Sequence, residues 1–263
     1  MHPMLNIAVR AARNAGRIIN RHVGHIDNLS VDLKQRNDFV TDVDRQAEAE
    51  IIATLHRAYP DHAFLAEESG QRGESDYVWI IDPLDGTTNF IHGFPQFAVS
   101  IALQHNQRLE HAVIYNPASD ELFTASRGQG AELNNRRLRV SRQKLLSGSL
   151  IGTGFPYRDD QNLERYLDTF RQMVSATAGV RRPGAAALDL AYVAAGRLDG
   201  FWEMGLKPWD IAAGALMIRE AGGLVGNLRG EEGWLDSGNI VAGNPKVFHA
   251  MLQLLKPSAE HYD

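Results

Sequence analysis

The sequence contains no cysteine. This absence excludes disulfides, thiolate metal sites and cysteine nucleophiles, and a reducing compartment suffices to explain it. No apolar run approaches the roughly 20 residues that a membrane-spanning helix needs. The N-terminus also shows no apolar segment followed by a small-residue cleavage site. We therefore expect a cytoplasmic protein that makes no membrane contact.

Excess positive charge and metal-binding histidine patterns are also missing. The chain has 27 Lys and Arg against 32 Asp and Glu, so its formal net charge is −5. Non-specific electrostatic binding of nucleic acid is therefore not expected. The ten histidines show no His-x-His or His-Glu-x-x-His spacing, which argues against a histidine-built zinc site. Hydrophobic residues make up 44% of the 263, as in an ordinary globular protein.

Hydrophobic periodicity predicts a mixture of helices and short strands. Helical spacing of apolar residues predicts helices over 4–23, 44–58, 161–176, 185–196, 210–221 and 245–255. Four strand patterns follow one another between residues 77 and 125, and short strands lie between the later helices. These blocks predict a layered α+β fold. Because no linker or low-complexity stretch is present, we expect one domain, 1–263, whose halves (about 1–145 and 146–263) enclose the active site.

Residues 79–90 carry the strongest chemical signal. An apolar strand pattern ends in Asp82 and Asp85, and Pro83 stiffens the turn between them so that both carboxylates can converge. Gly86 permits a tight turn, and the three polar residues after it suit a helix start whose N–H groups can hold a phosphate. Hard oxygen ligands beside a phosphate site favour magnesium or manganese over zinc. A turn that merely caps a helix would explain these paired acids poorly.

Three further acids stand at positions of interest. Glu67 follows an apolar strand-like run, Asp210 opens a predicted helix, and Asp44 closes the segment before another helix. Each also has an ordinary structural explanation. Asp44 and Asp210 are typical of helix N-caps, and Glu67 with Glu68 is typical of a solvated loop.

Taken together, these segments resemble a known family. The resemblance rests on Glu67-Glu68, Asp82-Pro83-Leu84-Asp85-Gly86-Thr87-Thr88, Gly184-Ala185-Ala186, Trp209-Asp210, Gly222-Gly223 and Gly238-Asn239-Ile240-Val241-Ala242-Gly243-Asn244. They look like the lithium-sensitive, magnesium-dependent phosphatases, and within them the inositol monophosphatase family, most of all its bacterial SuhB-type members. The resemblance covers nearly the whole chain. It implies an αβαβα sandwich, an inositol-phosphate phosphatase activity and a homodimer.

The resemblance implies a magnesium site built from acids. One ion would be held by Glu67, Asp82 and the carbonyl of Leu84. A second would be held by Asp82, Asp85 and Asp210, so that Asp82 bridges the pair. A third, weaker ion would join through Glu67 and water.

The resemblance also implies the catalytic and substrate contacts. Thr87, supported by Asp44, would orient a metal-bound water for attack on phosphorus, with Glu67 also in the catalytic set. The N–H groups of Gly86 and Thr87 would hold phosphate oxygens. The residues that would contact the remainder of the substrate are Asp85, Gly184, Ala185, Glu203 and Asp210. Relatives often carry Ser or Thr where this chain has Ala185, which bears on fine substrate preference.

Two alternatives stay open at this stage. The substrate of the same reaction could be fructose 1,6-bisphosphate, a nucleotide 3′-phosphate or NADP, although no obvious adenine platform is visible and Glu203 favours a neutral polyol. The chain could instead be an interaction module in transcription antitermination and ribosomal RNA maturation, with elongation factors or RNA polymerase as partners. Candidate surfaces are an arginine stripe (Arg10, Arg13, Arg17, Arg21) and the basic cluster from Arg136 to Lys144.

Overall fold

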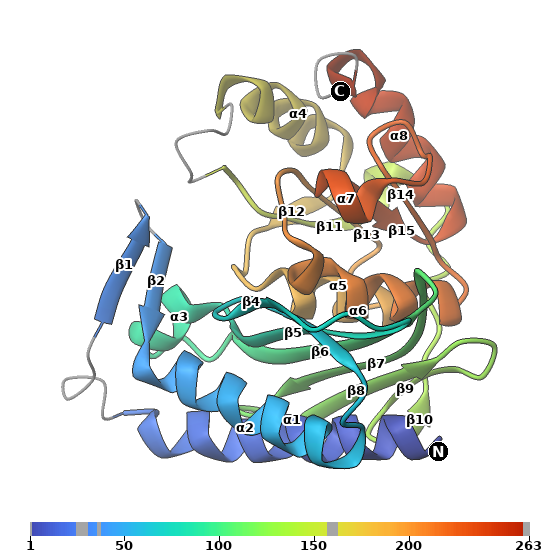
Figure 1. Cartoon of the computed structure of the whole chain (residues 1–263). Helices are drawn as coiled ribbons and strands as arrows, with labels where there is room; N and C mark the ends of the chain where they lie inside the picture. The colour runs from blue at the N-terminus through green and yellow to red at the C-terminus, as the bar shows by residue number, and fades with distance from the viewer. Residues whose placement is uncertain (1, 25–30, 36–37, 157–162, 260–263) are drawn as a thin grey trace.

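The computed structural model describes residues 2–24, 31–35, 38–156 and 163–259. Within these residues, none of the helices is long and apolar enough to cross a membrane. The elements form five layers in the order helices, sheet, helices, sheet, helices (Figure 1). The fold is therefore the α+β sandwich of αβαβα type that the sequence predicted.

The helical layers are formed as follows. The first layer is α1 (Pro3–His22) and α2 (Asp42–Ala58), the middle layer α5 (Ala186–Ala194) and α6 (Pro208–Glu220), and the last layer α4 (Leu163–Ala176) and α8 (Pro245–Ala259). The predicted helices are thus confirmed, with shifts of a few residues at their ends. Residues 161–162, where one of them was expected to begin, lie outside the described part. Two short helices, α3 (Thr87–Ile91) and α7 (Trp234–Ser237), and the 3₁₀ helix η2 (Leu146–Gly148) complete the set among the described residues.

Among the described residues the larger sheet has eight strands and the smaller has five. The larger runs β10 (Arg136–Arg137), β9 (Gly130–Leu133), β8 (Glu121–Ser126), β7 (Arg108–Asn116), β6 (Ala98–His105), β5 (Tyr77–Asp85), β3 (Ala63–Ala66) and β4 (Gly70–Arg72). The smaller runs β12 (Gly179–Arg181), β11 (Leu150–Thr153), β13 (Gly200–Glu203), β15 (Ile240–Gly243) and β14 (Leu224–Gly226). A separate hairpin joins β1 (Val31–Gln35) to β2 (Asp38–Thr41).

Strand β5 shows why the layers hold together. Its alternate side chains Trp79 and Ile81 pack on the α1–α2 side, whereas Ile80 packs on the α5–α6 side. A strand covered on both faces reads as a nearly continuous apolar run, which is the pattern in the sequence. Because β5 is fixed from both sides, the acids at its carboxyl end are held on a rigid support.

A tight turn at Asn134-Asn135 joins β9 and β10. Both residues have positive φ, 47° and 63°, a conformation that Asn tolerates better than most residues and that two-residue hairpin turns require. The apolar run before Glu67 is confirmed as strand β3, whereas the hairpin β1–β2 and strand β4 were not predicted. These strands are short, and β4 consists of Gly-Gln-Arg, so they give no clear periodic signal.

Candidate active site

The two acids that end β5 flank a bulge in the sheet. Asp82 pairs with Ser100 of β6 and Asp85 pairs with Ala98, so two residues on β5 oppose one on β6. Pro83, within the bulge, has no N–H to offer the ladder. The N–H of Leu84 instead donates to Asp82 Oδ1 at 3.0 Å. This local irregularity re-aims the carboxyl end of β5 and brings both aspartates into one site.

Four carboxylates influence one another at this point. Burial first, and then the charges of Glu67, Asp85 and Asp210, raise the pKa of Asp82 well above its usual range. Burial and Asp210 likewise raise the pKa of Asp85, with smaller effects from Glu67 and Glu203. The structure therefore gathers acids from β5, from the turn after β3 and from α6, which lie far apart in the sequence.

Buried like charges of this kind suit a cation. Removing ionised carboxylates from water is costly, and their mutual repulsion adds to the cost unless a positive charge balances it. Oxygen-only donors of this type are the ligands that Mg²⁺ prefers. No group of three or more Asp, Glu or His side chains in the described residues is already arranged to hold a metal ion.

A hydrogen-bonded pair, Thr87 and Asp44, lies beside the acids. Thr87 Oγ1 is 2.9 Å from Asp44 Oδ1 and 3.0 Å from the carbonyl oxygen of Leu84, and its hydroxyl can donate to either. The other carboxylate oxygen of Asp44 accepts from the N–H and the hydroxyl of Thr41, at 2.8 and 2.5 Å. Burial raises the pKa of Asp44 to about 6, against the effect of these hydrogen bonds. Asp44 is thus a buried carboxylate whose two oxygens are both held by hydrogen bonds.

Asp44 and Asp210 do not cap their helices as expected. The N-cap of α2 is Thr41 and that of α6 is Lys207, so both aspartates occupy the third helical position. Asp210 Oδ2 accepts from the N–H of Lys207 at 2.7 Å, as Asp44 does from Thr41. In both helices the acid satisfies a backbone donor that the helix leaves free, which fixes its carboxylate. Ser100 of β6 also donates to the carbonyl of Trp209, tying the start of α6 to the large sheet.

The start of α5 contacts the same site. The N–H of Ala187, in the first turn of α5, donates to Asp85 Oδ2 at 2.7 Å. The side-chain amide of Asn89 in α3 lies 2.8 Å from the carbonyl oxygen of Pro183 and 2.7 Å from that of Gln96. Gly184 has φ +91°, which only glycine adopts at little cost. The segment that contains Gly184 and Ala185 is therefore anchored to α3 and Asp85.

Ala185 leaves a helix start without a side-chain cap. It is the N-cap of α5, with extended backbone angles and no side-chain hydrogen bond to the first turn. We predict that Ala185→Ser increases the free energy of unfolding by about 1 kcal/mol, because a serine hydroxyl can accept from a free N–H of that turn. Thermal denaturation tests this, with Ala186→Ser, one residue inside the helix, as the matched control. A cap effect is contradicted if both substitutions change stability equally.

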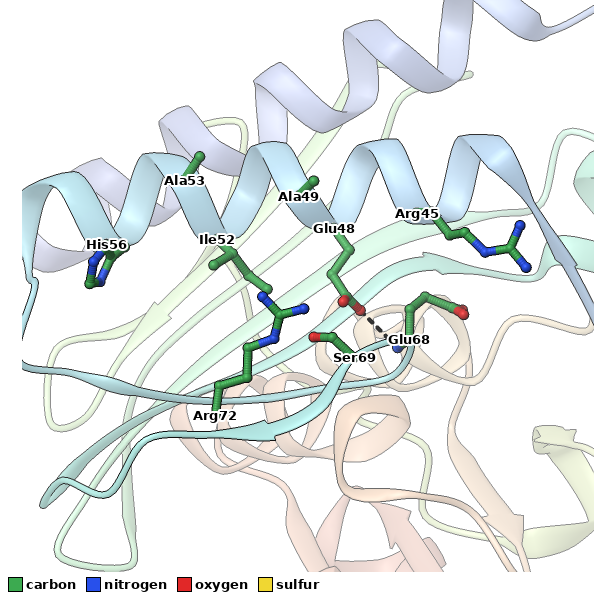
Figure 2. Close-up of a pocket in the computed structure, with 9 residues that line it drawn as sticks. All are labelled: Arg45, Glu48, Ala49, Ile52, Ala53, His56, Glu68, Ser69 and Arg72. Atoms are coloured by element: carbon green, nitrogen blue, oxygen red, sulfur yellow. Dashed lines mark hydrogen bonds between the residues drawn. The ribbon is translucent and has the colours of Figure 1, made fainter.

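A buried glutamate supports the turn that carries Glu67. Glu48 of α2 is 4% exposed, and its Oε2 accepts from the N–H of Glu68 at 2.8 Å. Figure 2 shows this bond at the wall of a cavity of about 400 Å³ between α2 and the β3–β4 turn. Arg72 reaches into the same view from β4. Sequence reasoning missed Glu48, because its role depends on a contact twenty residues along the chain.

Sequence reasoning also missed Asp189. This residue of α5 is 1% exposed, and within the described residues its Oδ1 has no hydrogen-bond partner. Burial, followed by the charges of Glu203 and Asp85, raises its pKa well above the usual range, while Arg182 acts in the opposite direction. Asp189 therefore adds a further acid beside the site.

Comparisons with known proteins identify the family of the chain. A model of the inositol monophosphatase family matches residues 1–259. The chain belongs to this family.

Three proteins of known name or structure are similar to this chain. The chain is 59% identical, over 98% of its own length and 97% of the other's, to a Pseudomonas aeruginosa protein named Nus factor SuhB. The crystal structure of extragenic suppressor protein suhB from Bartonella henselae is 48% identical, with a TM-score of 0.94 over 97% of this chain and 99% of that one. Inositol monophosphatase from Anabaena (Nostoc) is 39% identical, with a TM-score of 0.83 over 96% of this chain and 95% of that one.

Proposed function

We propose that this protein hydrolyses a small polyol phosphate in a Mg²⁺-dependent reaction, with inositol monophosphate as the main substrate. The observation that carries the proposal is the mutual influence of Glu67, Asp82, Asp85 and Asp210 at the end of β5. Without cations this site would repel a phosphate. The acids thus make sense beside an anionic substrate only if they hold metal ions first.

The expected ligands are those that the family resemblance implies. Glu67, Asp82 and the Leu84 carbonyl would hold one ion, Asp82, Asp85 and Asp210 a second, and Glu67 with water a weaker third. When bound, Mg²⁺ would supply Lewis-acid activation of the phosphate and of the attacking water. Inhibition by millimolar lithium is a further expectation of the resemblance.

The chain itself would move the proton. Thr87 Oγ1 would accept a proton from the attacking water while its own proton passes to Asp44 Oδ1, 2.9 Å away. With a pKa of about 6, Asp44 is mostly ionised at neutral pH and is available for this step. The N–H groups of Gly86 and Thr87 would hold phosphate oxygens, and Glu203, Gly184 and Ala185 would line the polyol side.

This role of Asp44 predicts a pH profile. We expect kcat/KM to rise as pH increases through about 6, since the ionised form of Asp44 is the active one. Asp44→Asn should lower kcat about 10²- to 10⁴-fold and flatten that rise. Asp42→Asn is the control, because Asp42 is a half-buried residue of the same helix that pairs with Arg45. If Asp44→Asn keeps the wild-type pH profile, Asp44 does not take part in the proton transfer.

A substrate panel tests the proposed function. Phosphate release should be fastest from inositol 1-phosphate, should require Mg²⁺, and should stop when EDTA is added. Fructose 1,6-bisphosphate, a nucleotide 3′-phosphate and NADP should be poorer substrates. A faster reaction with one of these would keep the reaction class and replace the substrate, whereas no release from any of them would reject the phosphatase proposal.

A second candidate function rests on the names of the relatives. We propose that the chain also binds transcription elongation or antitermination factors, or RNA polymerase, because the Pseudomonas aeruginosa relative is named a Nus factor. The arginine stripe of α1 is only partly available for this purpose. Arg13 pairs with Asp120 at 3.3 Å and Arg17 bonds to Asn14, whereas Arg10 and Arg21 are exposed.

A pull-down with the elongation machinery separates the two roles. Asp85→Asn should abolish phosphate release and leave capture unchanged if the surface acts independently of catalysis. Loss of capture in the same variant would couple the two roles. We further propose a homodimer, which sedimentation would detect, and a cytoplasmic location.

A further inference from the structure

Two parallel strands end side by side at the polyol side of the site. Strand β11 pairs with β13 so that Ile151 lies opposite Gly200 and Thr153 opposite Trp202. Extending this register by one residue places Gly154 opposite Glu203 at the carboxyl ends of both strands. Ligands in α/β proteins bind outside such carboxyl ends. Glycine therefore stands next to the carboxylate that we propose to contact the polyol.

The Glu203 side chain lies over the bare α-carbon of Gly154. A Cβ atom built at Gly154 would overlap both carboxylate oxygens and the carboxyl carbon of Glu203. No other group comes closer to that position. The space that a side chain at 154 would fill is thus occupied by the end of Glu203.

The backbone gives no other reason for glycine at this position. Gly154 does not have the positive φ that marks Gly184 and Gly86. Any residue could adopt its backbone conformation, so the absence of a side chain matters only for space. The nearby Gly152 is different, because its missing Cβ leaves room for Leu198 and Phe201 of the core.

We infer that Gly154 is a specificity-determining residue, which positions the Glu203 carboxylate for a substrate hydroxyl by leaving its own side-chain space to it. The inference rests on the proposed function, in which Glu203 faces the polyol. The orientation of Glu203 would then be controlled by Gly154, a residue that contacts neither metal nor phosphate. A side chain at 154 would turn Glu203 away, and because Glu203 is the flexible partner the fold would accommodate it.

Kinetics of Gly154→Ala with two substrates test this inference. We expect KM for inositol 1-phosphate to rise about tenfold to a hundredfold, as for loss of a hydrogen bond to a charged group. For p-nitrophenyl phosphate, whose leaving group has no polyol hydroxyls, kcat/KM should stay within about twofold of wild type. In a Glu203→Ala background, Gly154→Ala should have no further effect. Equal losses on both substrates, or an additive loss in the double variant, would overturn the inference.

Gly179→Ala is the matched control. Gly179 lies on the neighbouring strand β12, also without positive φ, and a Cβ there would come no closer than 3.2 Å to the flexible end of Arg181. This variant should keep wild-type kinetics on both substrates.

A crystal structure of Gly154→Ala tests the geometry without an assay. It should show the Glu203 carboxylate displaced and the main chain of β11 in place; a shifted β11 with Glu203 unmoved would overturn the inference. If wild type were inactive on both substrates, the proposed function would fail, and this structure would still decide the positioning claim.

Discussion

Asp82→Asn is expected to lower kcat/KM for Mg²⁺-dependent phosphate release by at least about 1,000-fold. Asp82 is the proposed bridging ligand, and its pKa responds to Glu67, Asp85 and Asp210 together. Asparagine keeps the shape of the side chain and can still accept from the N–H of Leu84, but it removes the negative charge. The expected loss is therefore one of metal binding, with the fold intact.

Thermal denaturation in EDTA is the control for this substitution. Because Asp82→Asn removes a charge that its neighbours repel, the metal-free variant should be at least as stable as metal-free wild type. Asp168→Asn, at an exposed position of α4, should change neither activity nor stability appreciably. An Asp82→Asn variant that keeps more than a tenth of wild-type activity would contradict the proposed metal site.

The stabilisation that Mg²⁺ confers is expected to grow as pH rises. Burial and repulsion raise the pKa values of Asp82 and Asp85 in the folded chain, whereas the unfolded chain releases both protons near pH 4. Above pH 4 the metal-free folded state thus holds more protons than the unfolded state. Its stability therefore falls as pH rises towards the raised pKa values. Bound Mg²⁺ would favour the ionised carboxylates and offset this fall.

Two other groups, Asp44 and His111, also contribute to the pH dependence of the folded state's stability. The raised pKa of Asp44, about 6, also makes the folded state less stable as pH rises, as for Asp82 and Asp85. Above pH 6 it lowers the free energy of unfolding by about 3 kcal/mol. His111 has the opposite sign, since burial lowers its pKa to about 4, so its contribution increases between about pH 4 and 6.5. The difference between Mg²⁺ and EDTA curves removes the His111 contribution.

Melting temperatures between pH 5 and 8 measure this linkage. The gap between excess Mg²⁺ and EDTA should widen with pH, and saturation at about 100 times Kd would correspond to about 2.7 kcal/mol. In Asp82→Asn the gap should nearly close. A gap that stays constant across this pH range in wild type would show that Mg²⁺ binds elsewhere.

The layered fold was predictable because its main elements have clear periodicity. The buried run of β5 and the apolar faces of α1 and α2 are visible in the sequence. The five-residue helix α3 and the hairpin β1–β2 are too short for a periodic pattern to develop, so only the start of α3 after Gly86 was predicted. Their formation depends on tertiary contacts, such as those of the Asn89 amide with Gln96 and Pro183.

The family resemblance predicted that Glu67, Asp82, Asp85 and Asp210 lie together, as they do, but their local geometry was not predicted. Thr41 precedes Asp44 by three residues, which is the spacing of a capping box, so the position of Asp44 could have been read from the sequence. No such signal precedes Asp210, because the N-cap Lys207 has no capping side chain. Asp189 and Gly154 gave no signal, since each acquires its role only when β11, β13 and α5 pack together.

Anomalous scattering from crystals soaked in Mn²⁺ tests the central claim most directly, because Mn²⁺ takes the oxygen ligands of Mg²⁺ and is visible in an anomalous difference map. We expect the strongest peaks to lie among Glu67, Asp82, Asp85 and Asp210, and to vanish in Asp82→Asn. Strong peaks elsewhere, with none among these carboxylates, would contradict it.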